Sequence, residues 1–166
     1  MSAFVERWHP ETSSFHMSWG EMTITLHDAS LILGLPIDGS AAIPVVDDRP
    51  QMARFADFFH VGDHWMTRPN YDKGGVSHLQ LQRLLIPDPL NQVDLLHEPP
   101  VVAFGFLLFL LGSTLFPDKS QNRIPITYLD LVEDHQEVRA TSWASAALCH
   151  LYRSLREASR AEAKLV

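Results

Sequence analysis

One run of the sequence is too apolar to face water on any side. Residues 101–116, VVAFGFLLFLLGSTLF, carry no charge and stand between Pro99-Pro100 and Pro117-Asp118. The run is shorter than the roughly 20 residues that a membrane-spanning helix needs, so it predicts a central helix enclosed by protein. Gly105 and Gly112 are seven residues apart, on one face of that helix, where glycine lets a neighbour approach closely. The core of the protein must therefore form around this helix.

A β-hairpin is predicted near the N-terminus, over residues 13–26 (SSFHMSWGEMTITL), because Thr23, Ile24 and Thr25 favour an extended backbone on one side of a glycine turn. Thr25 and Asp28 then have the spacing of a capping box, which predicts the start of a short helix. We expect that helix to place Leu26, Ala29, Ile32 and Leu33 inward.

A last helix is predicted over residues 138–164, with its small residues Ala140, Ala144 and Ala147 packed against the helix at 101–116. The chain has 166 residues and is 46% hydrophobic, which suits one domain with a real core. The expected fold is therefore mainly α, a compact helical domain over residues 1–166 with one small N-terminal β-hairpin.

The charge of the chain argues against nucleic acid as a partner. The formal net charge is −7, and a field of that sign repels phosphate backbones. Residues 25–36 (TLHDASLILGLP) resemble the first helix and turn of a helix-turn-helix, but residues 37–48 carry three acids and no base where a basic recognition helix would follow. A nucleic-acid-binding module is therefore kept as an alternative and direct binding is not expected.

The cysteine content and the N-terminus indicate a reducing compartment, such as the cytosol or the nucleus. Cys149 is the single cysteine, which excludes an internal disulfide. The N-terminus MSAFVERWHP has neither the basic start nor the apolar run of a signal peptide. We expect neither secretion nor a membrane location.

No motif in the sequence carries known chemistry. His60 and His64 are four residues apart, but Gly62 interrupts the helix that would align them, and a zinc site needs a third ligand. Walker, GxGxxG, HExxH and GxSxG motifs are all absent. We therefore expect no catalytic residue, no metal and no cofactor, with a small-molecule enzyme of unknown type kept as a second alternative.

Lys119 is considered as a reactive amine. A lysine that forms a Schiff base must be desolvated to be nucleophilic at neutral pH. Lys119 lies in PDKSQN, one of the most hydrophilic segments of the chain. Asp118, Ser120 and Asn122 are residues that fold back onto backbone amides in turns. The segment is therefore interpreted as a corner after the central helix.

Two blocks of the sequence resemble a known family. Residues 4–39, with ERW and GEMTITL, and residues 106–155, with LFPDKS and SWASA, resemble the two conserved blocks of the plant mobile domain. The family has been labelled aminotransferase-like, a label that the setting of Lys119 does not support. The resemblance implies a non-catalytic, mainly nuclear protein, with the cytoplasm as a second compartment, acting in transposon silencing, genome stability and meristem maintenance. It also implies a partner of the serine/threonine phosphatase type, and self-association is an open alternative.

A protein-interaction module needs a binding surface, and tryptophan and arginine are the commonest residues in interface hot spots. The candidate partner-binding residues are Trp8, Trp19, Asp118, Lys119, Asn122 and Arg123. For each tryptophan, packing in the core is the competing interpretation.

Overall fold

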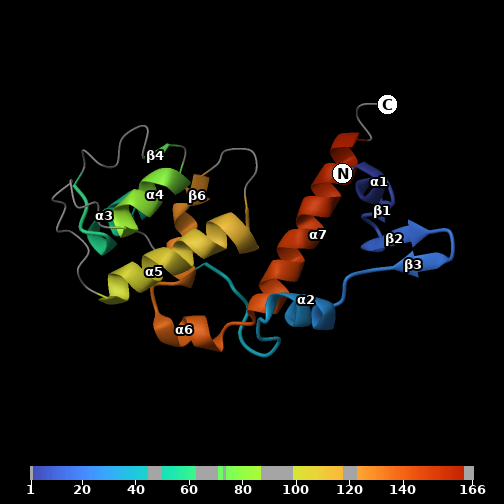
Figure 1. The fold of residues 1–166 in the computed structure, drawn as a ribbon, viewed down its shortest axis with the longest axis horizontal. Helices are drawn as coiled ribbons and strands as arrows, with labels where there is room; N and C mark the ends of the chain where they lie inside the picture. Colours follow the sequence, from blue (N-terminus) through green and yellow to red (C-terminus); the bar gives the residue numbers. More distant parts are fainter. Residues whose placement is uncertain are drawn as a thin grey trace. The chain divides into compact units, whose positions relative to one another are not determined.

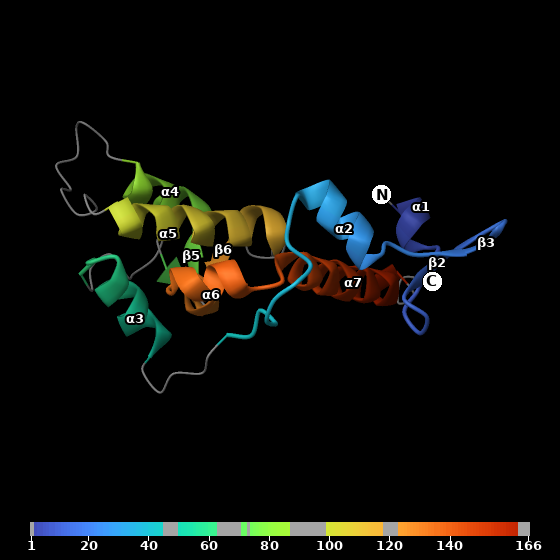
Figure 2. The same cartoon turned by 90° about the horizontal axis from the view of Figure 1, so that it is seen from below.

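The computed structural model describes residues 2–44, 50–62, 71–72, 74–86, 99–117 and 123–162. It is mainly helical with a small N-terminal antiparallel sheet, as predicted (Figures 1 and 2). That sheet has three strands instead of two, and a second three-stranded sheet, which the sequence did not predict, follows later in the chain. Contacts between Cα atoms divide the chain into two compact units: unit 1 is Met1–Ala42 with Ala140–Val166, and unit 2 is Ile43–Arg139. The assignment of residues 1–166 to a single domain stays a prediction.

Unit 1 combines the N-terminal sheet with the last helix. It contains α1 (Ser2–Val5), β1 (Trp8–His9), β2 (Ser14–Met17), β3 (Gly20–Met22), α2 (Leu26–Leu33) and α7 (Trp143–Glu162). Strand β2 pairs with both neighbours and aligns Trp8, Phe15 and Met22 in one row. Because side chains alternate along a strand, this row lies on one face of the sheet. The Trp8 ring lies 5.4 Å from the ring of Tyr152 on α7, so this face packs on α7.

Helix α2 begins at the capping box that the sequence predicted. The Asp28 carboxylate accepts a hydrogen bond from the Thr25 backbone N–H at 2.9 Å, and the Thr25 hydroxyl accepts one from the Asp28 N–H at 3.2 Å. Hydrogen bonds from Thr25 lower the pKa of Asp28 below its usual range. Gly34 ends the helix in the left-handed region, with φ 66°, where glycine is favoured.

A polar clasp holds the start of α7 to the segment after α2. The backbones of Ser40 and Thr141 form an isolated parallel β-bridge. The Ser142 hydroxyl donates a hydrogen bond to the Ile37 carbonyl. Gly39 has φ +134°, and a Cβ there would lie 2.2 Å from the Ala140 carbonyl oxygen. The clasp also interrupts the predicted helix over 138–164, which is observed as α6 (His135–Ala140) and α7.

Unit 2 holds most of the large buried side chains. In chain order it contains α3 (Gln51–Phe58), β4 (Tyr71–Asp72), β5 (Gly75–Ser77), α4 (His78–Leu85), α5 (Pro99–Leu110), the π-helix η1 (Leu111–Leu115), β6 (Arg123–Pro125), the 3-10 helix η2 (Ile126–Leu131) and most of α6. Helices α4 and α5 lie side by side (Figures 1 and 2). Three side chains of this unit are completely buried: Phe55 on α3, Phe59 directly after α3, and Leu81 on α4.

The central apolar run forms α5 and continues into η1. Its two glycines do allow close approach: a Cβ on Gly105 would lie 2.1 Å from Leu85, and one on Gly112 would lie 2.5 Å from Ile124. These two neighbours, Leu85 and Ile124, belong to unit 2, and packing of the last helix on this one through Ala140, Ala144 and Ala147 stays a prediction. Full enclosure was wrong, because Phe106 is 44% exposed and Leu110 is 50% exposed. One face of the helix is buried and the opposite face is half exposed.

A buried ion pair joins α3 to η2. The Arg54 side chain is 9% exposed and pairs with the carboxylates of Asp130, which is 5% exposed, and Glu133. Burial lowers the pKa of Arg54, but hydrogen bonds and charge from Glu133 and Asp130 outweigh it and raise the pKa above its usual value. The guanidinium therefore stays charged, and its removal would leave Asp130 buried without this cation.

Candidate functional site

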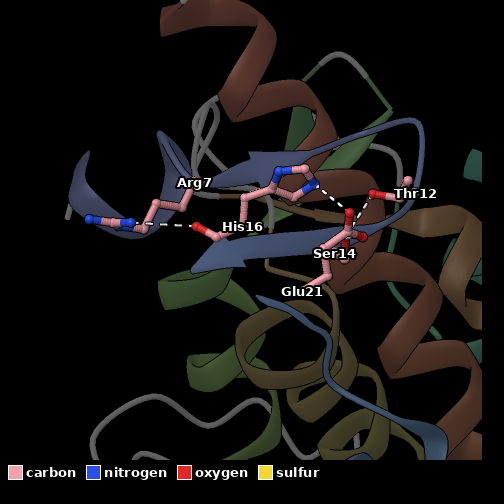
Figure 3. Close-up of polar contacts among 5 residues, drawn as sticks. All are labelled: Arg7, Thr12, Ser14, His16 and Glu21. Carbon is pink, nitrogen blue, oxygen red and sulfur yellow. Dashed lines mark hydrogen bonds and ion pairs between the residues drawn. The ribbon is translucent and has the colours of Figure 1, made fainter. Parts of the chain in front are cut away.

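The outer face of the N-terminal sheet carries a cluster of polar side chains (Figure 3). Pairing of β2 with β3 places His16 opposite Glu21. His16 Nε2 lies 2.9 Å from Glu21 Oε1, and the Ser14 hydroxyl donates to Glu21 Oε2 at 2.8 Å (Figure 3). The Thr12 hydroxyl lies 2.7 Å from that of Ser14. The cluster is thus a set of cross-strand contacts centred on one carboxylate.

This arrangement does not activate a nucleophile. In a catalytic triad the serine hydroxyl donates to a histidine, which can then accept its proton. Here Ser14 donates to the carboxylate of Glu21, and Ser14 itself is only 6% exposed. The His9 ring stacks on that of His16 with centroids 3.6 Å apart and planes 10° from parallel. Within the part of the chain that the structure describes, no group of three histidine, cysteine, aspartate or glutamate side chains is placed to hold a metal ion.

The two candidate tryptophans occupy opposite environments. Trp8 is 3% exposed and packs between Phe15 and Tyr152, so it is a core residue, the competing interpretation that the sequence offered for it. Trp19 is 78% exposed in the turn between β2 and β3. Of this pair, Trp19 is the side chain that a partner could reach.

The remaining candidates belong to unit 2 or fall outside the described residues. Arg123 is half-buried on β6, with Nη1 3.5 Å from the Gly75 carbonyl oxygen. Asp118, Lys119 and Asn122 lie outside the described residues, so the predicted corner is not tested. His64 is outside them as well, and His60 follows α3 with φ 52°. A single surface formed by the six candidates therefore stays a prediction.

The helix-turn-helix alternative finds no second helix. The first helix is α2, which spans Leu26–Leu33. Residues 34–44 are all described and contain no helix. A recognition helix directly after the turn is therefore missing from this stretch.

A surface that the sequence analysis missed lies at the C-terminal end of α2. Leu31 is 70% exposed, Ile32 is 76% exposed and Leu33 is 43% exposed, so the expectation that Ile32 and Leu33 point inward was wrong. Ala29 is the residue of this helix that is buried. The signal was present in the sequence LHDASLIL, because three consecutive large aliphatic residues span about 200° around a helix and cannot all face one neighbour. Adjacent exposed aliphatic side chains are typical of a protein-binding surface.

The helices of the described residues are either short or, like α7, carry charged side chains. None of those in the described residues combines the length and the apolar character that a bilayer-spanning segment requires.

Comparison with known proteins places the chain in a family. The model of the plant mobile domain matches residues 1–165. The chain is 35% identical over 162 residues to Protein MAIN-LIKE 2 of Arabidopsis thaliana and 30% identical over 171 residues to Protein MAINTENANCE OF MERISTEMS of the same plant. It is 36% identical over 165 residues to the Arabidopsis Serine/threonine-protein phosphatase 7 long form homolog.

These matches cover nearly all of this chain and a minor part of each relative. The aligned regions take in 96%, 100% and 96% of the chain, but 23%, 34% and 12% of the three relatives. The chain therefore spans about a third or less of the length of these relatives. No solved structure matches it.

Proposed function

The chain belongs to the plant mobile domain family, and from that premise we propose that it is a non-catalytic protein-interaction module whose partner is a serine/threonine phosphatase-like protein. The relative named as a phosphatase homolog supports this choice of partner, because a segment similar to this chain forms 12% of it. In that relative the domain and the phosphatase homolog are parts of one chain. A separate domain can bind the same kind of protein, but without the high effective concentration that a covalent link supplies.

The exposed aliphatic end of α2 is the observation that carries this proposal. Leu31 and Ile32 are both at least 70% exposed. Covering them with a partner would remove apolar surface from water, which favours association. The capping box and Gly34 fix both ends of the helix, so little order has to be gained on binding.

The cellular setting that we propose follows the family. The module acts in the nucleus, in transposon silencing, genome stability and meristem maintenance. The name of one relative, Protein MAINTENANCE OF MERISTEMS, supports the last of these roles. A fluorescent fusion in plant cells and transposon transcript levels in plants lacking the protein test the location and the silencing role.

The molecular proposal is tested by titrating the purified chain with the catalytic domain of a plant serine/threonine phosphatase in a calorimeter. We expect binding, and we expect Ile32→Ser to weaken it about tenfold, in the range of an interface hot spot. Leu79→Ser is the matched control, since Leu79 is 52% exposed on a helix of unit 2. Absence of binding by the unmodified chain would refute the choice of partner, and equal losses in the two variants would refute the surface.

A further inference from the structure

We propose that the tip of the N-terminal sheet is a second docking surface and that its occupant is a basic, extended segment of another protein, with a lysine or arginine side chain lying on the ring of Trp19. The inference goes beyond the proposed function, because it concerns a different surface and does not depend on a phosphatase. It rests on three observations in unit 1: a tryptophan exposed in a fixed turn, apolar side chains that reach the surface of the same sheet, and an excess of acidic over basic residues.

The exposed tryptophan is held by the strands on either side of it. Trp19 is 78% exposed, and the residues that flank its turn, Met17 and Gly20, pair with each other. Gly20 has φ +136°, which other residues rarely adopt. The turn is therefore fixed by pairing and by glycine. An aromatic side chain presented in this way provides contact area at a low cost in conformational entropy.

The apolar face of the same sheet reaches the surface beside Phe15. Phe15 is buried, and its ring centroid lies 6.1 Å from that of Phe4, which is 66% exposed. Met22 is paired with Phe15 across the strands and is 49% exposed. A partner segment with apolar residues between its charges would therefore find further contacts on this sheet.

The negative charge of unit 1 favours a partner segment that is basic. With histidine counted as neutral, the described residues of unit 1 carry a net charge of −3, because seven acids stand against four arginines: Glu6, Glu11, Glu21, Asp28, Asp38, Glu157 and Glu162 against Arg7, Arg153, Arg156 and Arg160. The Glu21 carboxylate is fixed by Ser14 and His16. A cation on the Trp19 ring gains from the face of the indole and from the negative charge of the unit, in which Glu21 is two residues along the chain from Trp19. The same charges repel nucleic acid, anionic lipid and a second copy of this surface.

The test is a selection of random dodecapeptides, displayed on phage, against the whole chain. We expect the enriched peptides to carry a net positive charge and at least one apolar residue. A synthetic enriched peptide should bind Trp19→Ala about tenfold more weakly than the unmodified chain. Met52→Ala, at an exposed apolar position of unit 2, should leave its affinity unchanged. Glu6→Gln should weaken it about two- to fivefold at low salt.

Circular dichroism of each variant checks that the fold is kept. The proposal is overturned if no peptide is enriched, if the enriched peptides are acidic or uncharged, or if they bind Trp19→Ala as well as the unmodified chain. It is also overturned if sedimentation shows a dimer that Trp19→Ala abolishes, since the occupant would then be a second copy. None of these outcomes bears on phosphatase binding through Ile32, so the two proposals fail separately.

Discussion

The two units of this protein bury their large apolar side chains to different extents. Among the described residues, all nine of the largest fully buried side chains are in unit 2. Of the six buried apolar residues in the described part of unit 1, three are alanines, whereas Trp19, Leu31 and Ile32 are at least 70% exposed. Unit 2 also exposes large apolar side chains, such as Ile43 at 72%, so the difference between the units is in their cores, which are large in unit 2 and small in unit 1.

The two units are also stabilised by different kinds of contact. Unit 2 relies on close packing, with Leu85 and Ile124 filling the space at two glycines, and on a buried guanidinium. Unit 1 relies on polar contacts with the backbone: the clasp at Gly39, the capping box of α2, and Tyr152, whose hydroxyl donates to the Ile24 carbonyl at 2.5 Å. A unit held in this way can keep its shape with a small core, which leaves apolar side chains free for recognition.

The largest effect is expected in unit 2, from Arg54→Ala. Removal of the guanidinium leaves the buried Asp130 carboxylate without this cation, which costs about 3–5 kcal/mol of unfolding free energy. Chemical denaturation measures the loss, and hydrogen exchange should localise it to α3 and η2. Arg153→Ala is the control, because its ion pair with Glu157 is exposed and should contribute at most about 0.5 kcal/mol. Equal effects of the two substitutions would contradict a buried core contact.

The corresponding test in unit 1 is Gly39→Ala. The added Cβ would clash with the Ala140 backbone carbonyl at a φ that favours glycine, and we expect a loss of about 2–3 kcal/mol. Gly34→Ala is the matched control, since Gly34 also has a positive φ but no heavy atom within 4 Å of the added Cβ, so its cost should be about 1 kcal/mol. Hydrogen exchange then sharpens the comparison, because amides of unit 1 should lose protection while those of α5 keep it. Uniform loss in both units would show that they do not unfold separately.

A smaller effect is expected at the cap of α2. Thr25→Ala should cost about 1 kcal/mol. Because folding lowers the pKa of Asp28, this carboxylate contributes stability above the unfolded pKa of about 4, and the contribution is lost as the pH falls through the folded value. Melting temperatures of the wild type and Asp28→Asn should therefore converge below about pH 4. A difference that persists in acid would mean that the charge is not what stabilises the cap.

The smallest effect on stability is expected from Ile32→Ser, which should change the unfolding free energy by less than about 0.5 kcal/mol because the side chain is mostly exposed. Leu108→Ser, at a completely buried position of unit 2, is the contrasting substitution, since it leaves a cavity and buries a hydroxyl. Thermal unfolding of the two variants tests the contrast directly. If Ile32→Ser is also strongly destabilising, α2 is part of a core and is not a free surface.

Features that depend on neighbours in the sequence were predicted well. The hairpin around Gly20, the capping box of Thr25 with Asp28 and the close approach at Gly105 and Gly112 are all present. The hairpin and the capping box follow from backbone preferences and from contacts within a few residues, whereas the glycines predicted only that something could approach closely, because their neighbours Leu85 and Ile124 lie elsewhere in the chain. The prediction failed for α2 and α5, where helical spacing identified the apolar residues but not which of them would be covered.

The sequence by itself determined the family, the mainly helical fold, the hairpin and the capping box, and the last two depend on residues that are close together in the chain. Only the tertiary structure decided that Trp8 is buried while Trp19 is exposed, and that Arg54 pairs with Asp130, 76 residues away. The physical reason is that burial and ion pairing depend on which distant segments come together. An apolar or charged residue has the same local preferences whether or not another part of the chain covers it.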